Sequence, residues 1–567
     1  MTHAHRATAE PEPGRGPRIA PAILAGLLLL SLALRLPNLP RRQMVEGDGV
    51  HYATLARSIL IGDLSGLANP YWSNLWPGVI AATSFATGLD VVAAGRLASL
   101  VAGAALTVFT AMLGARLFSP LVGILAGLGV AVHPWLVQFS TVVFTESFFS
   151  LLLVATLLLG WSAIGSPSPT RGAALGAVVG AALMTRPETH GAAFVIALFL
   201  LGRGWKAGEM RRACGSLAVA ALVAALFVGA RALIVHHYFH DWDFGQSKGT
   251  ANLILGMEDQ KERAFSGLTA DGENRLAAQM REWSMLRLLW TYPGRVLQHT
   301  GRNFLELGGC AFRVFPPLPV TMGREAFRGT PLWRALDLTA TACMAVAGLA
   351  LLQGLRTRDT RGAAAFLGAT LAVYFVGLAP LYVHERMIVA VTPVFLILMG
   401  QGMVVVGTAV AGFRLRPLGY ALLFLPAALL SLAGLLRSRN FDYVSEPLVQ
   451  KEAGLWLRER FSQELRLTAV SPSIPFYFYD AQHQSNAIDF PWVEYGPFMA
   501  YARKEQVDLV AASEWQLEAA GFPTAPNLLP AGDHPGLRYV GTVGEESHRV
   551  HVFRLEPSPE SPARADP

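Results

Sequence analysis

Long apolar segments alternate with short polar ones along most of the chain. An apolar helix of about 20 residues is long enough to cross the hydrocarbon core of a bilayer. The pattern therefore predicts an α-helical polytopic membrane protein with about 11 transmembrane segments. The expected spans are 18–36, 91–115, 118–137, 146–164, 172–186, 190–203, 213–235, 335–355, 362–382, 387–411 and 418–436.

Two of these spans are short. Segments 172–186 and 190–203 are either tilted crossings or a re-entrant pair, and the parity of the later spans is the same in both cases. Glycines at 172, 176 and 180 recur every four residues, which favours close packing of the first of these helices on a neighbour.

The two ends of the chain differ from the middle. Residues 1–17 are polar and rich in proline, which predicts a disordered tail, and the first apolar run is long enough to be a retained helix. Beyond the transmembrane domain, 18–436, the polarity rises and short strand-like runs alternate with helical ones. We therefore predict a small soluble α/β domain at 437–567. Its strand-like runs are 465–470, 507–511 and 550–555, and its helical runs are 451–461 and 495–504.

Composition and charge agree with the membrane prediction. The chain is 52% hydrophobic and only 15% charged, which excludes an ordinary soluble enzyme. Its formal charge is +6, but the basic residues gather in short loops, so the excess does not indicate nucleic-acid binding. Three scattered cysteines form neither a disulfide framework nor a thiolate metal site.

The basic loops also predict the orientation. Clusters at 203–212, 356–361 and 414–416 are expected to be cytoplasmic, which makes the N-terminus cytoplasmic too. The loops 37–90 and 236–334 and the C-terminal domain are then extracytoplasmic. An amphipathic stretch at 282–290 is expected to lie along the interface. Arginine-rich loops and Ala/Gly/Leu-rich spans favour the inner or plasma membrane of a bacterium.

Four groups of ionisable residues fall where the predicted spans meet the outside. Three of them have a structural interpretation alone: Asp48 as a helix cap, Glu146 as a charge at a helix N-terminus, and Arg386 as a residue snorkelling to headgroups. The group at 186–190 favours function, because Arg186 lies on the side that the positive-inside rule makes poor in positive charge. The predicted topology, however, places all of them at one face of the membrane, where charges are costly and often functional. The groups are Glu46, Asp48, His51 and Tyr52; Glu146; Arg186, Glu188 and His190; and His384, Glu385 and Arg386.

These residue types suit the transfer of a group from a lipid phosphate. Arginines hold a phosphate through planar, bidentate hydrogen bonds, and a carboxylate takes a proton from an incoming hydroxyl. Two carboxylates at unknown separation neither require nor exclude a divalent cation, so metal dependence stays open.

At these positions the chain resembles the GT-C superfamily of membrane glycosyltransferases, in the branch of the protein O-mannosyltransferases and aminoarabinose transferases. Asp48 and Tyr52 reproduce the Asp-x-x-x-Tyr spacing of that branch, and His384-Glu-Arg386 resembles its late arginine motif. Many relatives have Glu directly after the Asp, whereas this chain has Gly49, so Glu46 or Glu146 must supply a second acid. Further similarity lies at 55–60, 69–78, 94–98, 133–134, 145–147, 185–188 and Pro393.

The resemblance implies an inverting glycosyltransferase that uses a polyprenyl-phosphate-linked sugar on the extracytoplasmic face. Asp48 is then the general base, Arg186 and Arg386 hold the lipid phosphate, and Glu146 assists. The acceptor is a glycan, a lipid or a protein.

Two other functions are compatible with the residues. A lipid or sugar transporter would place charges near the middle of late spans, which have almost none. A non-catalytic scaffold would bind glycans through aromatic residues such as the run 476–479, although the core of a small α/β domain explains that run better. A large distance between Asp48 and the two arginines would favour the scaffold.

Overall fold

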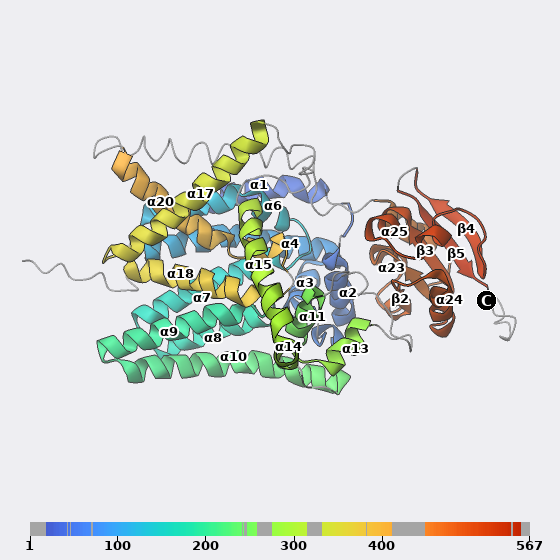
Figure 1. The fold of residues 1–567 in the computed structure, drawn as a ribbon, viewed down its shortest axis with the longest axis horizontal. Coiled ribbons are helices and arrows are strands. Elements are labelled where there is room, and N and C mark those ends of the chain that lie inside the picture. The colour runs from blue at the N-terminus through green and yellow to red at the C-terminus, as the bar shows by residue number, and fades with distance from the viewer. Residues whose placement is uncertain are drawn as a thin grey trace, which may run out of the picture.

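The structure is a computed structural model. It describes residues 19–41, 43–45, 47–69, 72–240, 242, 246–257, 275–314, 331–381, 383–410, 448–545 and 548–556. Figure 1 shows a bundle of long helices joined at one end to a smaller domain with a β-sheet.

Ten of the eleven predicted spans coincide with helices, and the eleventh, 418–436, lies outside the described residues. Among the described residues, six helical segments are long and apolar enough to cross a membrane, and shorter apolar helices accompany them. The fold class predicted from the sequence is confirmed. The helices are α1 (Pro21–Arg35), α4 (Val91–Leu117), α5 (Pro120–Val132), α7 (Glu146–Gly165), α8 (Pro169–Leu183), α9 (Thr189–Ala207), α10 (Met210–Phe239), α17 (Pro331–Arg356), α18 (Arg361–Leu378) and α20 (Thr392–Val410).

The short pair α8 and α9 packs beside α7 and α10 within the bundle (Figure 1). The predicted glycine stripe lies on the contact with α10. A Cβ at Gly172 or Gly176 would collide with the carbonyl groups of Ser216 or Ala220, so only glycine allows this approach. The prediction of close helix packing is confirmed.

Two predicted spans are interrupted. The span at 118–137 breaks at His133, which has extended backbone before Pro134, and continues as α6 (Pro134–Phe139). The residue before a proline disfavours helical backbone, which explains the break. The span at 387–411 is divided, because its first residues belong to a separate short helix, α19 (Glu385–Val389), which carries Arg386, and α20 begins at Thr392.

The segments outside the bundle are also largely helical. The first loop contains η1 (Leu36–Arg41), α2 (Asp48–Leu60), η2 (Leu64–Leu67) and α3 (Leu75–Thr87). The second long loop contains α11 (Gln246–Met257), α13 (Arg275–Glu282), α14 (Met285–Thr291) and α15 (Pro293–Val314).

The C-terminal domain has a five-stranded sheet in the order β2-β1-β3-β5-β4. Strands β1 to β3 are parallel, with Leu467 of β1 opposite Ala487 and Leu509, and β5 runs antiparallel to β3 and β4. The strands are β1 (Leu467–Ala469), β2 (Ala487–Asp489), β3 (Leu509–Ser513), β4 (Leu537–Val543) and β5 (Val550–Leu555). The helical segments are α22 (Val449–Arg460), α23 (Ser473–Phe478), η3 (Gln484–Asn486), α24 (Tyr495–Lys504), α25 (Glu514–Ala520) and α26 (Ala525–Leu528).

Helix α23 docks the C-terminal domain onto the first loop. The Phe476 ring is fully buried in a cluster with Val50 and Tyr52 of α2. The guanidinium of Arg57 lies 3.7 Å from the centre of that ring and donates a 2.8 Å hydrogen bond to the Phe476 carbonyl. Tyr477 accepts a 2.8 Å hydrogen bond from the backbone N–H of Val45. The aromatic run is thus core and interface rather than an exposed glycan-binding surface.

Candidate active site

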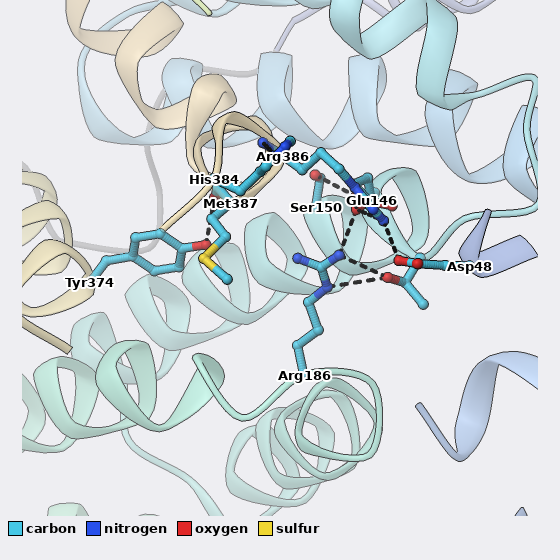
Figure 2. Close-up of polar contacts among 9 residues, drawn as sticks. Asp48, Glu146, Ser150, Arg186, Tyr374, His384, Arg386 and Met387 are labelled. Atoms are coloured by element: carbon cyan, nitrogen blue, oxygen red, sulfur yellow. Dashed lines mark hydrogen bonds and ion pairs between the residues drawn. The ribbon is translucent and has the colours of Figure 1, made fainter. Parts of the chain in front are cut away.

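Four segments that are far apart in the sequence meet at the end of the bundle nearest the C-terminal domain. Asp48 is the first residue of α2, Glu146 is the first of α7, Arg186 follows α8, and Arg386 is on α19. Both carboxylates stand at helix N-termini, where the helix dipole favours negative charge. Figure 2 shows the four side chains pointing toward one another.

Glu146 is the centre of the cluster. Its Oε1 accepts a 2.7 Å hydrogen bond from Arg186 Nη2 and a 2.9 Å hydrogen bond from Arg386 Nε (Figure 2). Arg386 Nη2 lies 2.8 Å from the same oxygen. The Glu146 side chain has no exposed surface, and no residue that the structure describes donates a hydrogen bond to its Oε2. A buried carboxylate normally satisfies both oxygens, so Oε2 is a place for a bound polar group.

Asp48 joins the cluster through Arg386. Arg386 Nη2 donates a 2.7 Å hydrogen bond to Asp48 Oδ2, and the Asp48 side chain is 34% exposed. The N-cap of α2 is Gly47, so Asp48 is not a simple capping residue. Gly47 has a φ of +47°, a conformation that glycine adopts more readily than other residues.

The backbone after Asp48 explains the departure at Gly49. A Cβ at this position would lie 3.1 Å from a methyl of Val45 and 3.3 Å from the carbonyl oxygen of Val143. Any residue with a side chain would need these neighbours to shift by a few tenths of an ångström, which favours glycine at this position. The second carboxylate beside Asp48 is instead Glu146, which reaches the cluster from α7.

Each arginine keeps donors for a ligand. Arg186 uses Nε and Nη2 for Thr145 and Glu146, and Arg386 uses Nε and Nη2 for Glu146 and Asp48. Within the part of the chain that the structure describes, Nη1 of either arginine has no hydrogen-bond partner. Burial opposes the charge of Arg386, but Asp48 and Glu146 outweigh it and raise the pKa of the guanidinium.

Comparison with known proteins shows which family and which folds this chain resembles. The family model of the dolichyl-phosphate-mannose-protein mannosyltransferases matches residues 77–230. No curated protein matches the sequence. Among solved structures, ArnT from Cupriavidus metallidurans bound to undecaprenyl phosphate has a TM-score of 0.58 at 15% identity, covering 96% of this chain and 100% of that one. The oligosaccharyltransferase AglB from Archaeoglobus fulgidus, in complex with an inhibitory peptide and a dolichol-phosphate, has a TM-score of 0.56 at 14% identity, covering 92% of this chain and 73% of that one.

The chain has the GT-C glycosyltransferase fold. The shared fold confirms the predicted fold class, and the family match over residues 77–230 supports the predicted resemblance. They also confirm that it is an integral membrane protein.

The carboxylates of this site do not fit a divalent cation as they stand. Arg386 Nη2 lies 2.7 Å from Asp48 and 2.8 Å from Glu146, in the position that a bridging cation would need. Among the residues that the structure describes, no group of three His, Cys, Asp or Glu side chains is arranged as metal ligands. We therefore assign no step to a metal.

Two other predicted residues border the cluster. Tyr52 is buried, and burial together with Asp48 raises the pKa of its phenol. His51 stacks on Trp72 with the ring centres 4.4 Å apart. Burial lowers the pKa of His51, and the charges of Asp48 and of Asp489 from the C-terminal domain oppose that shift.

The remaining predicted residues lie less centrally. His384 accepts a hydrogen bond from the backbone N–H of Arg386 and caps α19. The buried Oε2 of Glu188 accepts no hydrogen bond from the residues that the structure describes. His190 is exposed and contacts the carbonyl of Pro187, and Glu385 pairs with Arg313, so neither joins the cluster. Glu46 lies outside the described residues.

The sequence did not single out several residues that shape the site. The ring of Phe144 faces the guanidinium of Arg386, and Arg386 Cζ lies 4.5 Å from the ring centre. Tyr374 of α18 donates a hydrogen bond to the carbonyl of Met387 and so fixes α19 (Figure 2). Arg313 pairs with Glu385. A tyrosine inside an apolar span was an available signal for Tyr374, whereas only the tertiary structure identifies Arg313.

Proposed function

We propose that this GT-C glycosyltransferase moves a sugar from a polyprenyl-phosphate carrier to a glycan, lipid or protein acceptor, with inversion at the anomeric carbon. The observation that supports this best is the pair of arginines beside a carboxylate that solvent reaches, each arginine with an Nη1 that no described residue engages.

The arginines suit the phosphate of the donor. Their planar guanidinium groups are permanently charged and can each give parallel N–H donors to phosphate oxygens. Glu146 holds both groups through one oxygen, so the donors are fixed before the ligand arrives. The relatives ArnT and AglB are described with undecaprenyl phosphate and a dolichol-phosphate, which supports the same class of carrier here.

The two carboxylates suit different roles. Glu146 is completely buried and its Oε1 contacts two arginines, so it is a poor base for an incoming acceptor. The Asp48 side chain is one-third exposed and contacts one of the two site arginines, Arg386. Asp48 is therefore the general base of the proposal, and Glu146 is the residue that positions the arginines.

The reaction balances without a further reagent. The acceptor oxygen forms a bond to the anomeric carbon as its proton passes to the Asp48 carboxylate. The bond from that carbon to the phosphate oxygen breaks, and its electron pair stays on the phosphate. Arg186 and Arg386 stabilise the negative charge that develops there.

The test uses purified protein in nanodiscs with a panel of polyprenyl-phosphate sugars, and the readout is the release of lipid phosphate together with glycosylated acceptor. Asp48→Asn is expected to abolish transfer while donor binding persists. Asp63→Asn is the matched control, because Asp63 is an exposed aspartate of the same loop. Normal turnover in Asp48→Asn would remove Asp48 from the mechanism.

We also propose that the site faces away from the cytoplasm. The basic clusters at 203–212 and 356–361 lie at the end of the bundle opposite to α2 (Figure 1). The positive-inside rule makes that end cytoplasmic. In intact cells an impermeant maleimide should label Asp63→Cys but not the exposed Cys214 of α10. Labelling of Cys214 alone would reverse the orientation.

A further inference from the structure

Helix α15 has three faces, and each has a different composition. One face is buried against the protein. The second is exposed and apolar, and the third is exposed and polar. The buried face consists of Val296, Asn303, Leu307, Cys310, Ala311 and Val314. The apolar face consists of Leu297, Gly301, Phe304, Leu305, Gly308 and Phe312, and the polar face includes Arg295, Gln298, Arg302 and Glu306.

The exposed apolar face would be unfavourable if the helix were surrounded by water. Leu305 is 79% exposed and Leu297 is 74% exposed, although α15 already buries another face on the bundle. The preceding helix α14 continues the pattern, with Leu286 79% exposed and Trp290 90% exposed. A continuous exposed apolar strip of this kind marks a surface that contacts something other than water.

The position of α15 indicates what that surface contacts. The helix packs on α17, α18 and α19. Figure 1 shows that it crosses the direction of the long helices and lies in the part of the bundle nearer to α2. An amphipathic helix that lies across the spans is suited to the boundary between acyl chains and headgroups. The exposed arginines of the polar face, Arg295 and Arg302, suit lipid phosphates, and tryptophan is enriched at this depth.

We propose that α14 and α15 form a membrane-interface segment, with the apolar strip in the outer part of one leaflet and the polar face toward the headgroups. The occupant of the strip is the phospholipid bilayer. This placement does not depend on the proposed reaction.

The same helix holds the segment that carries Arg386. Asn303 donates hydrogen bonds to the carbonyls of Ala379, at 3.1 Å, and Leu381, at 2.6 Å. Arg313 Nε lies 2.6 Å from Oε1 of Glu385, the neighbour of Arg386. The interface segment therefore fixes the height of Arg386 relative to the bilayer surface, and under the proposed function it positions this arginine for a phosphate that arrives from the lipid.

The placement is tested with single cysteines carrying an environment-sensitive fluorophore, introduced into a Cys214→Ser, Cys310→Ala, Cys343→Ala background and reconstituted in nanodiscs. Phe304→Cys and Leu297→Cys report on the apolar strip. Gln298→Cys and Arg302→Cys are matched controls on the polar face of the same helix. Labels on the strip should be quenched several-fold more by lipids with a shallow doxyl group, and labels on the polar face should be quenched more by aqueous iodide. Equal iodide quenching on both faces, or quenching of the strip by neither agent, would overturn the proposal.

The coupling to Arg386 is tested separately by turnover. Leu305→Asp should reduce turnover several-fold in nanodiscs, whereas Gln298→Asp, on the polar face, should leave it unchanged. Asn303→Ala should raise the KM for the lipid donor more than it lowers kcat. If the labels lie in the lipid but these kinetic effects are missing, the interface placement stands and the coupling is refuted. An inactive wild-type protein with lipid-embedded labels would refute only the proposed reaction.

Discussion

Replacing Glu146 by glutamine tests the electrostatic design of the site most directly. The substitution keeps the shape of the side chain and one carbonyl oxygen, but it removes the negative charge that both arginines share. The Nη2 atoms of Arg186 and Arg386 lie 2.7 and 2.8 Å from the same Glu146 oxygen. The two cations are thus at most about 5.5 Å apart at these atoms, and their repulsion at an effective dielectric constant of about 20 is on the order of 3 kcal/mol. Asp48 still compensates one of the two charges.

We expect Glu146→Gln to lower the unfolding temperature of the free protein by several degrees and to reduce turnover, because the arginines separate. A polyprenyl phosphate between the arginines should replace the missing charge. Saturating carrier should therefore raise the unfolding temperature of the variant more than that of the wild type. The assay is thermal unfolding in detergent, with and without carrier.

Glu209→Gln is the matched control, because Glu209 pairs with Arg212 at the surface and exposed pairs contribute about 0–1 kcal/mol. Equal unfolding temperatures for Glu146→Gln and the wild type would show that the charge of Glu146 contributes little. A smaller stabilisation by the carrier in the variant would refute the assignment of the arginines to the phosphate.

Three further predictions concern the metal, the domain interface and the pH dependence. Chelation of divalent cations should leave turnover unchanged, because Arg386 occupies the place of a bridging ion; recovery of lost activity by added Mg²⁺ or Mn²⁺ would contradict this. Phe476→Ala should destabilise the fold by about 3 kcal/mol or more, as large-to-small changes in cores do, and should reduce turnover because its ring packs on α2; unfolding and turnover equal to those of the wild type would mean that the interface is unimportant. In the C-terminal domain, burial raises the pKa of Glu514, but hydrogen bonds from Arg549 and His551 outweigh it, so this pKa lies below its ordinary value of 4.5. A lowered carboxyl pKa stabilises the fold above the unfolded-state pKa, and that stability is lost as the pH falls through the folded-state pKa. Glu514→Gln should therefore unfold at a lower temperature than the wild type at about pH 7, and the difference should shrink as the pH falls below about 4.5; a constant difference would refute the assignment.

The sequence by itself determined the class of the fold. The apolar runs located ten helices of the bundle, because a bilayer requires long segments without charges and this requirement is visible in a single chain. The helix predicted at 495–504 matches α24, and the predicted strands 465–470, 507–511 and 550–555 overlap β1, β3 and β5. The sequence also supplied Asp48, Glu146, Arg186 and Arg386 as candidates, since charged residues beside apolar spans are costly and therefore conspicuous.

Only the tertiary structure decided how those candidates are connected. Arg386 contacts Glu146 across 240 positions of the sequence and Asp48 across 338. These contacts depend on how the helices pack, which a local pattern does not encode. For the same reason the sequence did not predict that Phe476 docks on α2 or that Arg313 pairs with Glu385. Local hydrophobicity fixes which segments are helices, whereas side-chain contacts between distant segments fix which charges face one another.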